Sequence, residues 1–250
     1  MKIICAGMSK CGTKSMHVAL EELGYMVHDF PDAYTHFEKH YRKCATEGWN
    51  SEDFHHMYKD IDAVVDAPTY YFWDELMEAF PDAKIILMKR DDDEIWYKSI
   101  RKQILSFNGL HSYYYQFLSS TWRKFFNFAT HPCKLAFGCK TPTIFDIIHV
   151  APPTLPYKLT YRKHIAHVLH KCPKDRLLIY NCKNGWRPLC EFLGKPMPTK
   201  IFPFINKNGE LSDMMWNMPI IKKARREMLT TAATLLVTSM FFGVYLFKFR

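Results

Sequence analysis

The stretch GMSKCGTKS, from Gly7 to Ser15, lies between an apolar run and a segment with helical spacing. The run before it, Lys2 to Ala6, is typical of a buried strand, and Lys14 to Leu23 repeats apolar residues at helical intervals. A glycine-containing loop between a strand and a helix binds phosphate well, because free backbone N–H groups and the helix dipole both favour an anion there. The sequence therefore predicts an anion-binding loop at the start of an α/β domain. An ordinary glycine turn is the alternative.

The loop departs from the pattern of nucleoside triphosphatases, G-x-x-x-x-G-K-[ST]. Thr13 lies where that pattern has its lysine, and Lys14 and Ser15 come one residue late. This shift argues against a site for ATP.

Strands alternate with helices along most of the chain, which predicts a mostly parallel central sheet flanked by helices. The middle, residues 108–157, is rich in aromatic residues and broken by prolines, so we expect helices with irregular connections there. The other expected strands are Tyr25 to Val27, Asp62 to Asp66, Ala83 to Met88 and Leu177 to Tyr180. The other expected helices are Phe72 to Phe80, Asp93 to Phe107, Tyr161 to His170 and Trp186 to Leu193.

The amino-acid composition limits which molecules and ions the protein is expected to bind. The chain has 250 residues, 48% of them apolar, and a formal charge of +9, so it is long enough for one folded domain that attracts something anionic. It has no zinc-finger or RNA-binding signature, and we expect no nucleic-acid partner. Its eight cysteines form no C-x-x-C pair, which favours reduced thiols facing the cytosol. His164, His167 and His170 have no partner ligands in sequence, and we expect no metal.

The C-terminal segment from Met228 to Phe247 has 20 residues and no charge, about the length that a bilayer core requires. Basic residues precede and follow it, and the larger group, Lys222 to Arg226, comes first. The sequence predicts a domain over 1–219, a basic juxtamembrane linker over 220–227 and a transmembrane helix over 228–247. The positive-inside rule then gives a single-pass, tail-anchored protein with its domain in the cytosol. A buried C-terminal helix is the alternative.

Three blocks of the sequence resemble a known family. Lys10 to Ser15, KCGTKS, resembles the 5′-phosphosulfate loop of sulfotransferases. The stretch from Asp62 to Ser99, with DAVVDAP, FW, FPDAKIIL, RD and WYKS in that order, is similar to the P-loop sulfotransferase-like family, and so is RLLIYNCKNGWRPLCEFLGKP, from Arg176 to Pro196. Together the blocks cover both ends of residues 1–206.

The resemblance implies transfer of a sulfuryl group from 3′-phosphoadenosine 5′-phosphosulfate (PAPS) to a hydroxyl or amine acceptor, with 3′-phosphoadenosine 5′-phosphate (PAP) as the product. It implies roles for Lys10 as the cation at the transferred group, for Arg90 and Ser99 at the 3′-phosphate, and for Asp66 as the general base. Tyr180 corresponds to an aromatic residue that stacks on adenine. The residues implied for the 5′-phosphate cradle are Lys10, Cys11, Gly12, Thr13, Lys14 and Ser15.

Several of these roles have structural alternatives. Lys14 could be a solvated lysine, Tyr180 could pack in the core, and Asp66 could cap the turn before Pro68. Ser99 follows Arg90 one residue later than is usual in the family. The acidic run from Asp91 to Glu94 is best interpreted as a helix N-cap. His28 and Asp29 are reserve candidates for the base, and Lys207 is a further candidate for the 3′-phosphate.

Residues 108–157 suggest an acceptor pocket for an apolar or aromatic molecule, which the membrane could supply. Packing in the core is the alternative for the aromatic residues concerned, Tyr113, Tyr114, Tyr115, Phe117, Trp122, Phe125 and Phe126. Two other functions compete with sulfotransfer: a small-molecule or nucleotide kinase that uses ATP and magnesium, and a tail-anchored adaptor that has lost its activity.

Overall fold

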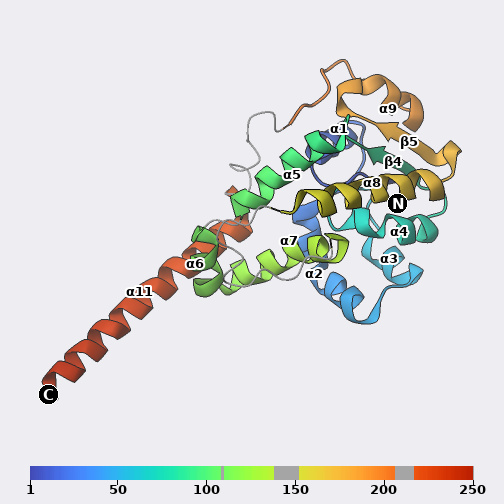
Figure 1. Ribbon diagram of the computed structural model, residues 1–250. Coiled ribbons are helices and arrows are strands. Elements are labelled where there is room, and N and C mark those ends of the chain that lie inside the picture. The colour runs from blue at the N-terminus through green and yellow to red at the C-terminus, as the bar shows by residue number, and fades with distance from the viewer. Residues whose placement is uncertain (108–109, 138–151, 206–216, 250) are drawn as a thin grey trace.

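The computed structural model describes residues 1–107, 110–137, 152–205 and 217–249 (Figure 1). The strands of this part form a sheet of five in the order β2-β3-β1-β4-β5, and every neighbouring pair is parallel. Short apolar runs suit these strands because helices cover both faces of the sheet. The strands are β1 (Ile3–Cys5), β2 (Val27–His28), β3 (Ala63–Val64), β4 (Lys84–Met88) and β5 (Leu177–Tyr180).

Two hydrophobic cores form because successive strand residues point to opposite faces of the sheet. Ile3 and Cys5 pack on one side, against α1, α5 and α9, whereas Ile4 packs on the other, against α3 and α4. Residues of α8 contribute to both cores. These helices are α1 (Thr13–Glu22), α3 (Ser51–Met57), α4 (Trp73–Ala79), α5 (Asp93–Phe107), α8 (Thr154–Lys171) and α9 (Trp186–Leu193).

The predicted mostly parallel sheet flanked by helices is confirmed. The structure adds α2 (Phe30–Glu47), which the sequence analysis did not predict, and begins α8 at Thr154 rather than at Tyr161. Short 3-10 turns complete the body: η1 (Thr69–Phe72), η2 (Lys174–Arg176) and η3 (Cys182–Asn184).

The aromatic middle region contains α6 (Leu110–Leu118) and α7 (Ser120–Phe137), which pack against each other and against the C-terminal helix α11 (Pro219–Lys248). A third core lies between them. This favours the packing alternative for most of the aromatic residues in the region, because Tyr115, Trp122, Phe125 and Phe126 are buried there. Tyr114 and Phe117 are exposed instead, and Tyr113 is not among the side chains that the structure describes.

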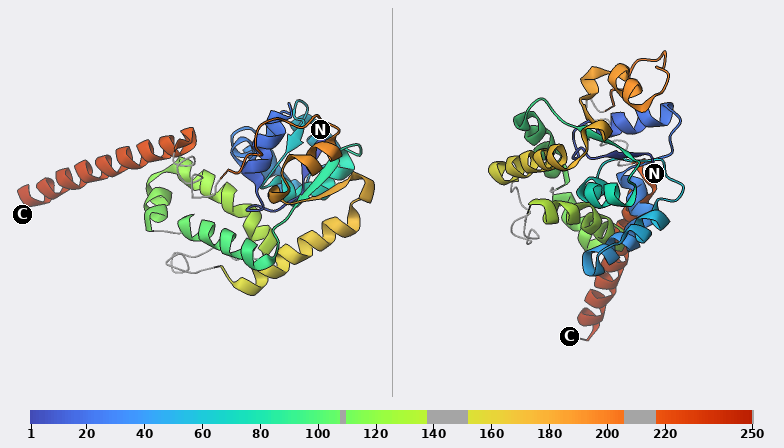
Figure 2. Two further views of the ribbon diagram at one scale, coloured as in Figure 1. Left: turned by 90° about the horizontal axis from the view of Figure 1, so that it is seen from above. Right: turned by 90° about the vertical axis from the view of Figure 1, so that its right-hand side faces the viewer.

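Helix α11 projects from the body, as Figures 1 and 2 show from three directions. Within the described residues it is the one helix long and apolar enough to cross a membrane, and none of its apolar window is buried against the protein. This exposure supports a single-pass anchor rather than a buried C-terminal helix. The segment 220–227, expected to be a linker, is helical and continuous with the span, and its Ile221 and Ala224 are buried against α6 and α7.

Candidate functional site

The candidate site lies at the edge of the sheet where the strands end. In a parallel sheet all carboxyl ends meet at one edge, and ligands gather where the strand order reverses. The chain passes from β1 to β2 and β3 on one side, then crosses to β4 and β5 on the other. The loop after β1, Asp66 after β3 and Arg90 after β4 therefore lie together.

Two glycines shape the loop between β1 and α1. A Cβ on Gly7 would lie 2.6 Å from the Met88 carbonyl oxygen of β4, so only glycine lets the chain pass there. Gly12 has φ +97°, and a Cβ there would lie 2.3 Å from the Cys182 sulfur. Lys10 also adopts a left-handed conformation, with φ 73°, which is uncommon for a residue with a side chain. Such strained backbone concentrates at functional sites.

The N-terminus of α1 faces this loop with its backbone N–H groups unused by the helix. The first intrahelical bond runs from Met16 N–H to the Gly12 carbonyl, so the amides of Thr13 and Lys14 precede it. No side chain caps this end, and the first turn has no acidic residue. An uncapped helix end with its dipole is a ready site for an anion.

Not every side chain expected in the cradle faces the loop. Ser15 is buried, and its hydroxyl accepts a bond from Ile205 N–H at 3.0 Å. Cys11 is also buried, against the Tyr161 hydroxyl, and burial raises the pKa of its thiol to about 12. At Ser15 the backbone N–H, and not the side chain, is available to an anion, whereas the Cys11 N–H donates to the Met8 carbonyl at 3.2 Å.

Lys10 and Arg90 come together from the loop and from the end of β4. The Arg90 Nε donates to the Lys10 carbonyl at 2.8 Å, and its backbone N–H donates to the Tyr161 hydroxyl at 3.0 Å. Burial lowers the pKa of the Lys10 ammonium; Asp66 opposes this, while Arg90 and Lys102 add repulsion that lowers it further. A bound anion would relieve the repulsion between these cations.

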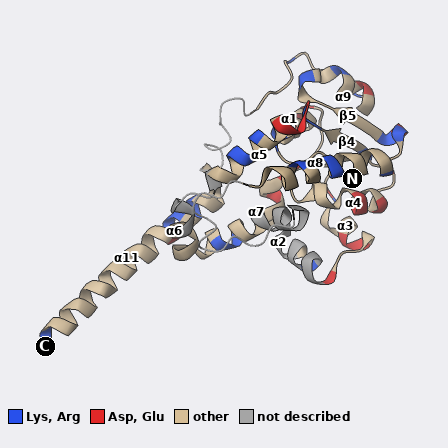
Figure 3. Cartoon of the chain, viewed as in Figure 1, with Lys and Arg blue, Asp and Glu red and all other residues tan. Residues whose placement is uncertain are grey.

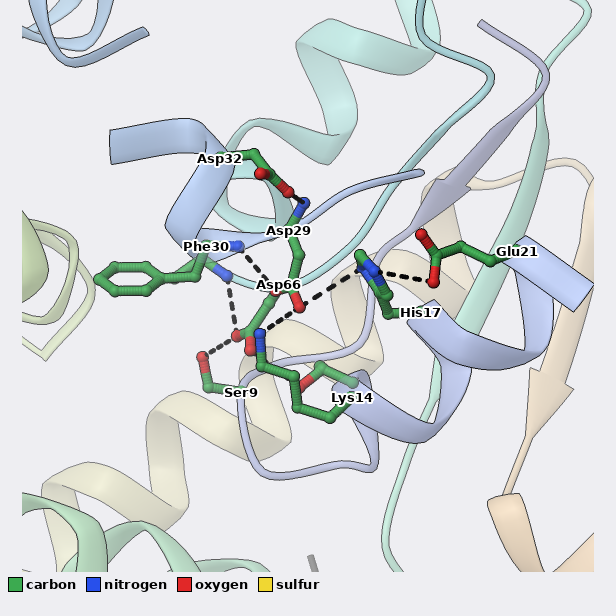
Figure 4. A network of polar contacts seen from close by, with 10 residues as sticks. Ser9, Lys14, His17, Glu21, Asp29, Phe30, Asp32 and Asp66 are labelled. Carbon is green, nitrogen blue, oxygen red and sulfur yellow. Dashed lines mark hydrogen bonds and ion pairs between the residues drawn. The ribbon is translucent and has the colours of Figure 1, made fainter. Parts of the chain in front are cut away.

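Asp66 lies at the centre of the site, beside the loop. Its Oδ1 accepts from the Ser9 hydroxyl and from Ala67 N–H at 2.8 Å, and its Oδ2 accepts from the Thr13 hydroxyl at 2.8 Å. Figure 4 shows the Ser9 hydroxyl directed at this carboxylate. Asp66 has φ 68°. The alternative role as a cap is present too, since its carbonyl accepts from the Thr69 hydroxyl at 2.6 Å.

Lys14 is not a solvated lysine, because its ammonium pairs with the Asp29 carboxylate at the end of β2 (Figure 4). The Asp29 side chain is 2% exposed and also lies 3.6 Å from His17 Nδ1. Burial raises the pKa of Asp29, and Lys14 opposes that rise. Asp29 is thus already paired with a cation, whereas the hydrogen bonds that the described residues donate to the Asp66 carboxylate, from Ser9, Thr13 and Ala67, come from neutral groups.

A pocket of about 350 Å³ opens beside Arg90 at the ends of β4 and β5, with Lys89 and Lys183 in its lining. Tyr180 contributes to this lining, but its side chain is only 1% exposed, and its hydroxyl donates to the Gly185 carbonyl at 2.7 Å. This favours the core-packing alternative for Tyr180 over adenine stacking. Ser99 is half-buried on α5, and Lys207 lies outside the described residues.

The acidic run after Arg90 caps α5, as the sequence indicated. Asp92 accepts from Ile95 N–H at 2.7 Å, and Asp93 and Glu94 pair with Arg162 and Lys158 of α8. Asp93 and Glu94 are therefore neutralised by α8, whereas Asp91 lines the pocket beside Arg90 and pairs there with Lys183.

Comparison with known proteins agrees with this geometry. Residues 2–211 match the family model described as a sulfotransferase domain. The chain belongs to this sulfotransferase family. It is also similar to Ava biosynthesis cluster protein M of Aspergillus versicolor, with 29% identity over 227 residues that cover 82% of this chain and 80% of the relative.

In this sulfotransferase domain, three residues that the sequence analysis missed support the loop. Ser9 donates to Asp66, the Trp96 Nε1 donates to the Ser9 carbonyl at 2.9 Å, and Tyr161 stacks on Trp96 at 4.4 Å between ring centroids. Ser9 could have been found from its place in the loop. Trp96 belongs to the WYKS block of the family resemblance, but its contact with the loop, like the position of Tyr161, could not be predicted, because both residues come from helices far along the chain and meet the loop only in the folded protein.

Proposed function

We propose that the chain transfers the sulfuryl group of PAPS to a hydroxyl or amine acceptor and releases PAP. One observation carries the proposal: the uncapped end of α1, the cations Lys10 and Arg90, and the carboxylate Asp66 meet at one edge of the sheet. The helix end and the two cations suit a nucleotide with phosphate at both ends. The Asp66 carboxylate suits an acceptor that must lose a proton.

The residues of the loop fit the donor's 5′-phosphosulfate. Backbone N–H groups at the start of α1 would hold the phosphate oxygens, and the Lys10 ammonium would oppose the charge that builds on the bridging oxygen as the sulfuryl group leaves. Because that charge is greatest in the transition state, Lys10 would lower the barrier as well as improve binding. Arg90 and the pocket beside it would receive the 3′-phosphate, since guanidinium suits phosphate oxygens.

Asp66 is the proposed general base. Ser9, Thr13 and the Ala67 N–H hold its two carboxylate oxygens in a fixed orientation next to the loop. A base must reach the acceptor proton within hydrogen-bond distance, and a position beside the sulfuryl site satisfies this need. Asp29 is the weaker candidate because Lys14 and His17 already surround it.

The proposed acceptor is an apolar or aromatic molecule. The apolar span of α11 would keep the domain close to membrane-dissolved acceptors. By the positive-inside rule, the basic residues before the span favour a cytosolic position for the domain. Protease protection of the full chain in sealed membrane vesicles tests this topology: a tag at residue 1 should be accessible from the cytosolic side, and a tag after Arg250 should not.

Thermal unfolding of the full chain in detergent tests the donor. Saturation at about 100 times Kd stabilises a protein by about 2.7 kcal/mol, or roughly 5–10 °C in Tm for a chain of this size. We expect PAP to produce such a shift, adenosine 5′-phosphate to produce a smaller one because it lacks the 3′-phosphate, and ATP with magnesium to produce little. Stabilisation by ATP with magnesium alone would indicate a kinase instead, and no response to any nucleotide would indicate an inactive adaptor.

A further inference from the structure

Helix α6 and the first turns of α11 form a surface outside the candidate site, which we call the docking face. It consists of the exposed aromatic residues Tyr114 and Phe117 together with the basic residues Lys222, Lys223, Arg225 and Arg226. α6 and α7 pack on the side of α11 that carries Ile221 and Ala224, so the aromatic part lies beside the same turns of α11 whose other sides carry the basic part.

Glu227 sets the level of this face relative to the expected span. Its carboxylate accepts from the Ser119 hydroxyl at 2.8 Å and from the Thr121 backbone N–H and hydroxyl at 2.9 and 2.5 Å. The α6–α7 turn is thereby held beside the residue that directly precedes Met228, where the charge-free segment begins. If α11 crosses a bilayer from that point, the turn lies at the membrane surface.

The aromatic side chains at this level are unusually exposed. Phe117 is 79% exposed and Tyr114 is 62% exposed, one helical turn apart on α6. Large aromatic residues exposed together mark a contact surface, and rings of this kind favour the boundary between headgroups and acyl chains. The Arg123 guanidinium donates to the carbonyls of Gln116 and Phe117 at 2.7 and 3.0 Å, which adds a positive charge to the same turn.

The basic part of the docking face has the charge and the position expected for contact with an anionic membrane surface. Ile221 and Ala224 point into the protein, so the four basic residues around them are left exposed in the last turns before the span. Figure 3 shows basic segments at the start of α11 and on α7, and beyond them a projecting helix without charge until Lys248 at its end. A basic residue at an anionic membrane surface contributes about 1 kcal/mol.

We propose that the docking face lies on the anionic surface of the same bilayer that α11 crosses, with the rings of Tyr114 and Phe117 among the lipid headgroups. The inference rests on α11 being a span and does not depend on the reaction proposed above. The contact, together with the bonds of Glu227, would hold the domain at one orientation to the membrane rather than leave it free on its anchor.

Fluorescence of a tryptophan placed on the face can test this in the full chain. We would compare Phe117→Trp with the parent, which has six tryptophans, in vesicles of phosphatidylcholine with phosphatidylserine and of phosphatidylcholine alone. Both would contain lipids brominated near the headgroup end of the acyl chains, which quench only on contact. Met197→Trp is the matched control, because Met197 is 63% exposed and follows α9 on the main body. Only protein that floats with the vesicles after a high-salt wash would be measured, so that α11 is inserted in every sample.

We expect loss of most of the fluorescence added at position 117 in the anionic vesicles, a smaller loss without phosphatidylserine, and no loss at position 197. Replacement of Lys222, Lys223, Arg225 and Arg226 by glutamine should remove the difference between the two vesicle types. A signal at position 117 as resistant to quenching as that at 197 would overturn the proposal, and if it were also blue-shifted it would indicate contact with a second protein copy. Equal quenching in both vesicle types would overturn the anionic-lipid assignment.

Discussion

Replacement of Asp66 by asparagine removes one negative charge from the site and keeps the shape of the side chain. The amide oxygen can still accept from Ser9 and from Ala67 N–H, and the Thr13 hydroxyl can turn to accept from the new NH₂ group. Only the charge assistance of these bonds is lost, a difference of about 1 kcal/mol, which corresponds to roughly 2–4 °C in Tm for a chain of this size. The fold should therefore survive.

Turnover should fall far more, because the amide cannot take the acceptor's proton. Loss of a general base costs ~10²–10⁴ in rate, or about 2.7–5.4 kcal/mol of transition-state stabilisation. PAP affinity should stay the same or become slightly tighter, since Asp66 repels a bound phosphate. The assay is transfer of radiolabelled sulfate from PAPS to a panel of phenols, steroid alcohols and aryl amines, with PAP affinity measured by calorimetry.

Asp29→Asn is the matched control, with the same chemical change at the neighbouring strand end. It leaves the half-buried Lys14 ammonium without its partner, and breaking a buried pair costs up to about 3–5 kcal/mol. We expect Asp29→Asn to lower Tm strongly and retain most of its turnover, the reverse of Asp66→Asn. Turnover of Asp66→Asn close to that of the parent would refute the assignment of the base.

Three further outcomes are expected. Arg90→Ala should weaken PAP binding by about 2–3 kcal/mol. It should also lower Tm slightly, because the hydrogen bond to the Lys10 carbonyl is lost. Unchanged PAP affinity by calorimetry would exclude Arg90 from the site. PAP affinity should fall as the pH rises through the lowered pKa of Lys10, because the neutral amine no longer attracts phosphate. The affinity of Lys10→Arg should stay constant over the same pH range. Identical pH profiles for the two proteins would contradict a contact between Lys10 and the phosphate. A chain truncated after Met228 should have a higher Tm than one truncated after Pro219, because the shorter chain lacks the buried turns of α11. Equal Tm values by circular dichroism would show that those turns add no stability.

Much of the fold could be predicted because its signals are local. Helix α5 begins and ends where its sequence predicted, since Asp92 provides an N-cap and apolar residues recur at helical spacing. The strand β5 also has its predicted bounds, and the loop from Gly7 is recognisable because glycine is required where the backbone passes close to β4. Helix α2 was missed although its apolar residues recur at helical spacing, because its segment is polar on average and gives no strong signal of a core helix.

The roles of individual side chains depended on contacts between distant parts of the chain. The sequence left Lys14 either in the phosphate cradle or solvated, but its ammonium pairs with Asp29 at the end of β2 once the chain is folded. Tyr180 and Ser15 match a family pattern, yet packing against Gly185 and Ile205 decides where their hydroxyls point. Such pairings cannot be predicted from local patterns.

The sequence by itself determined the alternation of strands and helices that builds the parallel sheet, the glycine-containing loop after β1, the strand-end positions of Asp66 and Arg90, and the uncharged C-terminal segment, because each depends on a local pattern of residues. Only the tertiary structure decided that Arg90 holds the Lys10 carbonyl, that Trp96 and Tyr161 support the loop, and that α11 is joined to α6 and α7 through Ile221, Ala224 and Glu227. The physical reason is that hydrogen bonds and packing act over a few ångströms, and folding alone brings residues so far apart in the chain within that range.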